Sequence, residues 1–507
     1  MKNYVLAHDL GTTGNKATLY DREGSLIGSV FHGYTTEYAH TGWAEQNPAD
    51  WWEALCISTR RLLQETRIAA DEIACIVFSG TMMGCVPLDR SGKPLGKAII
   101  WADQRSVEQD RWLAQRISRE EIYRITGHRV GPSTTLCKIL WLRDHAPDVY
   151  RAAHKFVQAK DAVVARLTGN IVTDHTDASG SNLYELDSAG WSGRILEAAQ
   201  IDAAQMPEIR QSTDVVGNVL PDVADEVGVP AGTPVVIGGG DGVAATVGAG
   251  VVSEGSAFTN LGASAWIALT TAKPIYEPEL KTFTFAHMIP GMFCPCGAMM
   301  TAGASYAWIR DQLGSPEVQA AQALGVSPYD LLNLQVSKSQ PGANGLIFLP
   351  YLLGERSPYW NAQARGAFVG LTIRHTRADM IRAVLEGITM NLLIIHNILV
   401  AQGAPIECMR VIGGGARGRV WNQIIADVYG MPVQRLATLG EATSLGAALA
   451  GGIGVGLYPN FTMIDTMNRV VETIEPDPAA RVVYEKAFPI FEATYRALVP
   501  IYEAMAQ

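Results

Sequence analysis

The sequence predicts an α/β protein of at least two domains, and three observations lead to this. Its 507 residues exceed what one hydrophobic core normally supports, so two domains, or three, are expected. Short apolar strands end repeatedly in turns of glycine, serine and threonine, which then lead into a second strand or a helix. A strand, a small-residue turn and a second strand occur at residues 4–20 and again at 257–270. This repetition suggests two duplicated domains that face each other.

The composition is that of a soluble globular enzyme, with 48% apolar and 18% charged residues. A net charge of −10 argues against nucleic acid or an anionic membrane surface as the main partner. No uninterrupted apolar run approaches the roughly 18 residues of a membrane span, and the first residues show no signal core. The seven cysteines are scattered, and Cys294 and Cys296 lack further zinc ligands nearby. We therefore expect reduced cysteines and a cytoplasmic protein.

The first strand, Tyr4 to Asp9, runs into a hairpin of glycine and threonine before a second strand at residues 17–20. The hairpin lacks the lysine and following helix of a Walker loop. Its backbone amides and the hydroxyls of Thr12 and Thr13 suit phosphate oxygens, and Asp9 is close enough to hold Mg²⁺ through water. An ordinary hairpin, with Asp9 bonded to nearby backbone N–H groups, is the alternative.

The loop at residues 42–48 precedes an amphipathic helix predicted over Pro48 to Thr66. Trp43, Glu45 and Gln46 combine a flat apolar ring with hydrogen-bonding groups, which suits sugar recognition; a tryptophan that caps the core is the alternative.

Two further strands end in candidate substrate contacts. The strand at residues 73–78 leads into a small-residue turn that contains Met82 and Met83, and the strand at 98–101 leads to Asp103 and Arg105. Asp103 and Arg105 follow a strand end, where contacts to polyol hydroxyls are expected, or they form a surface ion pair. Beyond them the pattern predicts helices at 107–122, at 133–145 and at 162–167, and a polar loop at 173–182.

One carboxylate stands in the neutral run from Val236 to Gly250. Residues 235–237 read as the end of a buried strand, three glycines follow, and Asp241 opens a run of small residues slim enough for a tightly packed helix. Open α/β sheets bind ligands beyond the carboxyl ends of their strands, so Asp241 is a candidate catalytic residue. An N-cap aspartate is the alternative.

The second half repeats the pattern of the first. Strands at 257–260 and 267–270 flank a turn that contains Gly262, Ala263 and Ser264. A strand at 410–412 ends in a glycine turn, residues 413–416, which is placed to carry an adenosine, with Asn422 on the following helix. Long helices are predicted at 377–399 and at 479–507; the second packs on its own core or on another subunit of a homodimer.

These motifs together resemble the FGGY family of carbohydrate kinases, in the actin-like ATPase superfamily, over essentially the whole chain. Residues 133–145, STTLCKILWLRDH, match the first family signature. Residues 366–371, GAFVGL, followed by Asp379-Met380 and by residues 383–386, match the second. The resemblance implies two ribonuclease-H-like domains around a central cleft: residues 1–249 bind sugar and carry the base, and residues 250–507 bind ATP.

The resemblance also implies a role for each motif. Asp241 corresponds to the general base, and Asp9 to a magnesium contact through water. Gly11, Thr12, Thr13 and Asn15 correspond to the phosphate-facing hairpin, and Gly262, Ala263 and Ser264 to its partner. Gly414, Gly415, Ala416 and Asn422 correspond to the adenosine site. ATP, Mg²⁺ and a small sugar are thus the expected ligands.

The substrate loop is closest in pattern to the xylulokinase subfamily, with two departures. Where that subfamily usually has Met-His, this sequence has Met82-Met83, and where Asn follows the base it has Gly242. Both changes remove polar groups from the expected sugar pocket, and such changes alter discrimination strongly. A ketopentose is expected, or alternatively another short ketose, a polyol or a deoxyketose whose methyl group suits Met83. The expected substrate contacts are Trp43, Glu45, Met82, Met83, Asp103, Arg105, Asp241 and Gly242.

Two competing functions are a catalytically silent sugar sensor and a chaperone-type or filament-forming ATPase. A silent member would be free to lose Asp9, Asp241 and the glycine turns, yet all are present. The two family signatures argue against the second alternative.

Overall fold

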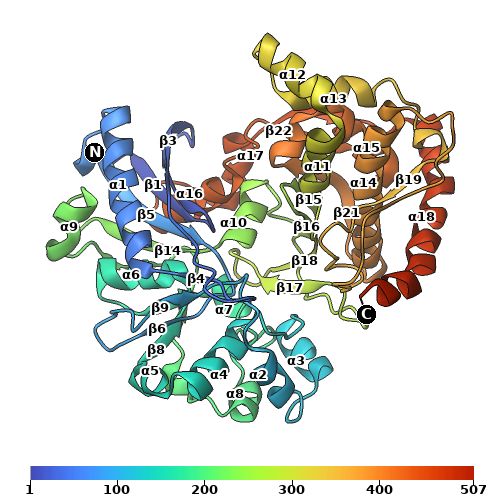
Figure 1. The fold of residues 1–507 in the computed structure, drawn as a ribbon. Coiled ribbons are helices and arrows are strands. Elements are labelled where there is room, and N and C mark those ends of the chain that lie inside the picture. The colour runs from blue at the N-terminus through green and yellow to red at the C-terminus, as the bar shows by residue number, and fades with distance from the viewer. Residues whose placement is uncertain (1, 507) are drawn as a thin grey trace.

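The computed structural model describes residues 2–506 and contains two large mixed β-sheets with helices around them (Figure 1). The six-stranded sheet has the order β13 (Val215–Asn218), β14 (Pro234–Gly240), β5 (Ile73–Gly80), β1 (Tyr4–Leu10), β2 (Gly14–Tyr20), β3 (Leu26–Gly33). The seven-stranded sheet has the order β17 (Phe283–Ala286), β18 (Phe293–Met299), β16 (Ala265–Leu269), β15 (Gly255–Leu261), β21 (Ile406–Ile412), β22 (Val433–Leu436), β23 (Val470–Ile474).

The two sheets share one topology. In the first, β1 pairs antiparallel with β2 and parallel with β5; in the second, β15 pairs antiparallel with β16 and parallel with β21. A short turn suffices to join antiparallel neighbours, whereas the parallel neighbours are joined by long crossovers that include helices. The α/β class and the duplication expected from the two hairpins are therefore confirmed.

Smaller strands and the helices complete the molecule. The remaining strands are β4 (Glu45–Gln46), β6 (Val86–Leu88), β7 (Ala98–Ile99), β8 (Lys155–Val157), β9 (Val172–Asp174), β10 (Tyr184–Glu185), β11 (Gly190–Trp191), β12 (Glu208–Arg210), β19 (Ile347–Leu349) and β20 (Ala367–Val369). The helices of the first half are α1 (Pro48–Thr66), α2 (Val107–Leu113), α3 (Arg119–Thr126), α4 (Thr135–His145), α5 (Pro147–Ala152), α6 (Ala159–Thr168), α7 (His175–Ser179), α8 (Gly193–Ala199), α9 (Pro221–Val227) and α10 (Asp241–Gly248). Those of the second half are α11 (Gly303–Leu313), α12 (Ser315–Leu324), α13 (Pro328–Val336), α14 (Arg377–Ala401), α15 (Arg419–Tyr429), α16 (Ala442–Gly454), α17 (Ile464–Met467) and α18 (Pro478–Met505).

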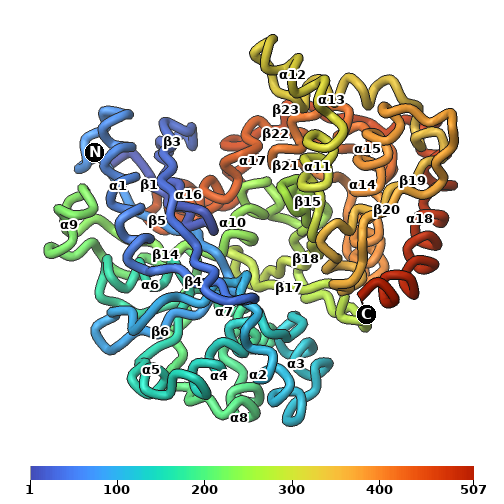
Figure 2. Tube along the Cα trace, viewed as in Figure 1, coloured from blue at the N-terminus to red at the C-terminus, as the bar shows by residue number. Residues whose placement is uncertain are grey.

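Helices α10 and α16 form the centre of the molecule. Although α16 belongs to the second half of the chain, it packs on β1, β5 and β14 of the first sheet, and the tube in Figure 2 shows this orange-red segment returning beside the blue strands. The two helices touch through glycine: a Cβ on Gly248 would lie 1.7 Å from the Ala442 carbonyl oxygen, and one on Gly446 would lie 2.0 Å from that of Ala244. The slim, tightly packed helix expected after Asp241 is thus observed.

Two predicted segments differ from the structure. The single helix expected over 107–122 is two helices, α2 and α3, because Ser118 caps the start of α3 by accepting a hydrogen bond from the Glu121 N–H. The polar loop expected over 173–182 contains β9 and α7. Asp174 caps α7, so the local side-chain acceptors that suggested a loop in fact begin a helix.

The two long helices of the second half are core elements on at least one face. Among the described residues, α14 alone is long and apolar enough to cross a membrane, and 78% of its most apolar window is buried inside the fold. Helix α18 buries Tyr484, Phe491 and Tyr495 in the second core, while Val482 and Ile490 stay exposed. The packing of the C-terminal helix on its own core is therefore observed, and a homodimer stays a prediction.

Candidate active site

Asp241 lies where β14 ends and α10 begins. Gly240 is the N-cap of α10 and Asp241 its first residue, so the carboxylate is not the capping group. It is half-buried and lines a cavity of about 390 Å³. The other residues around this cavity come from α10 and from the second half: Ala245, Asn260, Trp266, Ile412, Gly413, Gly414, Leu439, Gly440, Ala442 and Thr443. Asp241 therefore faces a crevice built by both halves of the chain.

Asp9 lies near the carboxyl end of β1, between neighbours fixed by the sheet register. Lys16 is its partner on β2 and Ser79 its partner on β5, and the Ser79 hydroxyl donates to Asp9 Oδ1 at 2.9 Å. Lys16 forms an ion pair of 3.0 Å with Glu441, just before α16. Asp9 thus sits beside the junction of the two halves, and its bond to a serine replaces the backbone N–H partners considered from the sequence.

Burial and the charge of Asp9 both raise the pKa of Asp241. Burial raises the pKa of Asp241 to about 7, the charge of Asp9 adds to the rise, and the Gly242 N–H opposes it. Burial also raises the pKa of Asp9, against the Ser79 hydrogen bond and the Lys16 charge. A carboxylate whose pKa is near neutrality can both hold and release a proton under ordinary conditions, which is what proton transfer requires.

Tyr34 joins this group from the loop after β3. Burial raises its pKa, and the charges of Asp9 and Asp241 both add to the rise, which places the phenol near both carboxylates. Its hydroxyl donates to the Gly11 carbonyl oxygen at 2.5 Å, so it also fastens the first hairpin.

The first hairpin is held by contacts to its backbone. Gln46 donates to the Thr12 carbonyl oxygen at 2.7 Å, and the Trp101 indole N–H donates to the Thr12 hydroxyl at 3.0 Å. Thr13 is exposed and Gly11 partly exposed, as expected of a loop open to a phosphate.

Asn15 does not belong with these groups. Successive residues of a strand point to opposite faces of the sheet, and Asn15 shares the face of its register partner Leu10, toward α1. Its side chain is fully buried and donates to His8 at 3.0 Å and to Ser58 at 2.7 Å. The phosphate contact expected for this side chain is therefore wrong.

The second hairpin, Gly262, Ala263 and Ser264, joins β15 to β16, and Ala263 and Ser264 are exposed. The start of α11 holds it, because the Gly303 N–H donates to the Gly262 carbonyl oxygen and the Ala304 N–H to that of Ala263. It corresponds in position to the first hairpin in the shared topology.

The glycine turn after β21 borders the same cavity as Asp241. Gly413 has φ 86°, a conformation that favours glycine, and the exposed Gly414 lines the cavity. Gly415 packs against Trp421, and Ala416 is buried.

Asn422 differs from its expected role. It is fully buried on α15 and donates to the Ala416 carbonyl oxygen at 2.8 Å. Asn422 therefore stabilises the backbone of the turn from the buried side. The structure does not show the adenosine contact that was expected for its side chain.

Arg105 holds the loop at residues 42–48, which was predicted to bind sugar and is called the sugar loop below, together with Asp103. The buried Arg105 guanidinium donates to Asp103 at 2.6 Å and to Glu45 at 2.7 Å, and it stacks 3.6 Å from the Trp43 ring centroid. Asp103 also accepts from the Ala44 N–H at 2.6 Å. The structure thus brings together four of the side chains expected at the sugar, Trp43, Glu45, Asp103 and Arg105. Asp103 and Arg105 form a buried ion pair, so the surface ion pair considered from the sequence is wrong. Their direct contact with a polyol stays a prediction.

The two methionines after β5 have different environments. Met82 is buried against Gly240, where a Cβ would lie 2.5 Å from its Cγ. Met83 has φ 64°, and its carbonyl oxygen accepts from Lys138 at 2.6 Å. Gly242 is equally constrained, because a Cβ there would lie 2.6 Å from the Trp266 ring. Trp266 therefore occupies the space into which a side chain at position 242 would point.

The oxygen donors near Asp9 fit a hard cation held mainly through water. The charge of Asp9 raises the pKa of Asp241, and the charge of Glu441 raises the pKa of Asp9, so negative charge gathers here that a divalent cation would neutralise. Within residues 2–506, no cluster of three His, Cys, Asp or Glu side chains forms a complete protein cage for a metal.

All seven cysteines are free and six are buried, as expected of reduced packing residues.

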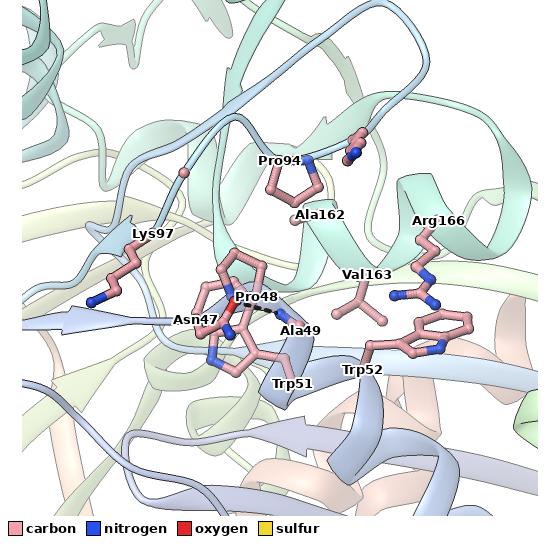
Figure 3. A pocket seen from close by; sticks show the side chains of 12 residues that line it. Asn47, Pro48, Ala49, Trp51, Trp52, Pro94, Lys97, Ala162, Val163 and Arg166 are labelled. Carbon is pink, nitrogen blue, oxygen red and sulfur yellow. Dashed lines mark hydrogen bonds between the residues drawn. The ribbon is translucent and has the colours of Figure 1, made fainter. Parts of the chain in front are cut away.

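A larger cavity, of about 450 Å³, lies elsewhere, between the start of α1, helix α6 and the 93–97 segment (Figure 3). Its lining includes Trp51, Trp52 and Arg166, and no carboxylate among the described residues. Helix α1 covers the sheet face that Leu6 and Leu10 share, opposite the face that packs on α16. This cavity is therefore not the one that holds the chemistry.

Four residues of the site were assigned no role from the sequence: Tyr34, Ser79, Trp101 and Trp266. The sequence could have suggested Trp266, because this residue comes just after the second hairpin, which was itself predicted to face the phosphates. Ser79 and Tyr34 carried no such signal, because their nearness to Asp9 depends on strand register and on the path of a loop.

Comparisons with known proteins agree with this geometry. Residues 4–248 match the model of the FGGY family of carbohydrate kinases, N-terminal domain, and residues 257–455 match its C-terminal domain. The xylulose kinase of Staphylococcus epidermidis (strain ATCC 12228 / FDA PCI 1200) is 33% identical over 499 residues, covering 98% of this chain and 97% of that protein. The gluconokinase of Bacillus licheniformis is 31% identical over 511 residues, covering 100% and 98%. The ligand-bound xylulose kinase structure from Lactobacillus acidophilus has a TM-score of 0.91 at 28% identity, covering 99% of both chains.

Proposed function

This chain belongs to the FGGY family of carbohydrate kinases and is an ATP-dependent carbohydrate kinase, and we propose that Asp241 is its general base and a ketopentose its substrate. The observation that carries the proposal is the position of Asp241. Its carboxylate, with a pKa of about 7, lies in a cavity shared with the glycine turn of the other half. We further propose the domain boundary at residues 249 and 250, a cytoplasmic location, and a sugar and ATP as ligands in place of nucleic acid or membrane.

The geometry supports a direct phosphoryl transfer. In such reactions the protein mainly aligns the reactants and neutralises charge. The two hairpins would offer backbone N–H groups and hydroxyls to the phosphates. The turn at Gly413 and Gly414 lines the cavity of Asp241 and would lie beside the nucleotide. The Asp241 carboxylate accepts the proton of the sugar hydroxyl as its oxygen attacks the γ-phosphorus. Closure of the crevice excludes water, the competing acceptor.

Mg²⁺ is proposed as the accompanying cation, held at Asp9 through water. When bound, it would neutralise charge on the β- and γ-phosphates. Ser79 keeps the Asp9 carboxylate in place for this role, because its hydroxyl already occupies one carboxylate oxygen.

The relatives named above are a xylulose kinase and a gluconokinase, so xylulose and gluconate are the two sugars to compare. A ketopentose is favoured because the Arg105 side chain is only 1% exposed and already paired with Asp103 and Glu45, which disfavours a further pairing with a sugar carboxylate. One observation favours gluconate as the second candidate: the Arg356 guanidinium stacks 5.5 Å from the Trp101 ring centroid, near the sugar loop. A deoxyketose remains a third candidate on account of Met83.

A kinetic panel tests the substrate. With ATP and Mg²⁺, D-xylulose is expected to give the highest kcat/KM among ketopentoses, 1-deoxyketoses, polyols and D-gluconate. ADP formation should depend on the added sugar. Gluconate as the best substrate would replace the ketopentose proposal, and sugar-independent turnover would contradict a carbohydrate kinase altogether.

The pH dependence of the reaction tests the base. Because Asp241 must be ionised to accept a proton and its pKa is about 7, kcat/KM should fall about tenfold per pH unit below that value. This fall at low pH is the acidic limb of the pH profile. Because the charge of Asp9 is one cause of the raised pKa of Asp241, Asp9→Asn should move the acidic limb to lower pH. The same variant should also lower the rate. Asp89→Asn, a partly exposed aspartate outside the cavity, is the control and should leave the limb in place. An acidic limb that does not move in Asp9→Asn would contradict the coupling.

A further inference from the structure

A buried ionic cluster lies beneath the base and has no part in the mechanism above. Lys160 on α6 contacts three carboxylates, at 2.7 Å from Asp161, 2.9 Å from Asp174 and 3.0 Å from Asp177. All four side chains are fully buried. Burying charge costs free energy even when ions are paired, so such a cluster is weak support for stability and calls for another explanation.

Hydrogen bonds connect this cluster to the turn that carries Asp241. The Thr176 hydroxyl, on α7, donates to Asp174 Oδ2 at 2.6 Å and accepts from the Gly240 N–H at 2.7 Å. Gly240 is the N-cap of α10 and precedes Asp241. A hydroxyl that donates to a carboxylate becomes a better acceptor, so the ionised Asp174 strengthens the bond to Gly240. Burial would raise the pKa of Asp174, but Lys160 and Thr176 hold it below its usual value.

The space around these groups is also closed. A Cβ on Gly239 would lie 2.9 Å from the Thr176 hydroxyl oxygen, and one on Gly80 would lie 3.1 Å from the Lys160 Cβ. Gly80 follows Ser79, the residue bonded to Asp9. The cluster therefore lies against the end of β14, which leads to Asp241, and the end of β5, whose Ser79 bonds to Asp9. This leaves no room for the turn to shift toward the cluster.

We propose that Thr176, oriented by Asp174 and Lys160, is a positioning residue that sets the direction of Asp241 through the Gly240 N–H. The inference rests on the proposed role of Asp241 as the base. A strand-to-helix turn of three glycines is conformationally permissive, so its direction must be fixed from outside. A reacting group displaced by about 1 Å can cost on the order of 100-fold in rate.

Two variants that lack the hydroxyl test the proposal: Thr176→Val, which keeps the shape, and the smaller Thr176→Ala. Both should lower kcat by about 10- to 100-fold while the Kd for ADP stays within twofold, because the nucleotide contacts lie on other elements. Thr176→Ser keeps the hydroxyl and should restore most of kcat. Thr168→Val is the matched control: its hydroxyl is also buried, donates to the Val164 carbonyl oxygen and accepts from the Asn170 N–H, but is not bonded to the base turn.

Several outcomes would overturn the inference. These are full kcat in Thr176→Val, an equal loss of kcat in Thr168→Val, or a loss of fold in both hydroxyl-free variants, which would show a structural role only. Failure of the proposed function looks different, because then Asp241→Asn itself would stay active. If Asp241→Asn is inactive and Thr176→Val is not, only the positioning role fails.

Discussion

Asp241→Asn is expected to lower kcat for sugar phosphorylation by about 10²- to 10⁴-fold, the range that general-base catalysis typically supplies. Asparagine has nearly the same shape as aspartate but cannot accept the hydroxyl proton. The Kd for ADP should change little, because the glycine turn and the hairpins that would hold the nucleotide are untouched. The measurement is steady-state phosphorylation of the best sugar together with ADP binding.

Stability supplies the control for this variant. The folded-state pKa of Asp241, about 7, lies above the ordinary value of 3.8, so ionising this group in the folded protein costs free energy. The cost is absent below pH 4, grows as the pH rises to 7 and then stays constant. Asp241→Asn should therefore gain about 2–4 kcal/mol of stability at pH 8 and almost none at pH 4. A folded variant that phosphorylates sugar at the full rate would exclude Asp241 as the base.

Gly248→Ala is expected to destabilise the protein by about 1–3 kcal/mol and to lower kcat as well. The added methyl would lie 1.7 Å from the Ala442 carbonyl oxygen, and because that atom belongs to the α16 backbone it cannot rotate away as a side chain would. Helices α10 and α16 would have to separate. One carries Asp241 and the other packs on the first sheet, so the separation displaces the base relative to Asp9.

Urea unfolding and steady-state kinetics measure this effect. Gly446→Ala should behave similarly, since its methyl would meet the Ala244 carbonyl oxygen at 2.0 Å. Gly193→Ala, at the start of α8, is the matched control because nothing lies within 4 Å of the added atom. Equal stability of Gly248→Ala and Gly193→Ala would contradict the close helix contact.

Much of the fold was readable because the strands are apolar and end in glycine. The helix predicted over Pro48 to Thr66 has those bounds, and the strands around both hairpins were found within a few residues. Residues 107–122 and 173–182 were misread because Ser118 and Asp174 begin helices there. A capping side chain and a loop side chain look alike until the following residues are seen to be helical.

Of the predicted site residues, some lie where the sequence suggested and others do not. Asp241, Asp9 and the glycine turns could be identified because their chemistry is local to a strand end. Asn15 and Asn422 were misassigned because each is close in sequence to a turn but has a fully buried side chain. The Asn15 side chain points away from its hairpin toward α1, and the Asn422 side chain bonds to the backbone of the turn. The direction of a side chain depends on which sheet face is covered, and the sequence shows the covering helix but not where it packs.

The sequence alone determined the two-domain α/β class, the family and the acid at position 241, because all of these are expressed in local patterns of apolar, glycine and carboxylate residues. The tertiary structure decided which groups surround that acid. It placed Asp9 and Tyr34 near it, Trp266 against Gly242, and Thr176 under the turn. These neighbours come from segments far apart along the chain, and only strand register and helix packing bring them within contact distance.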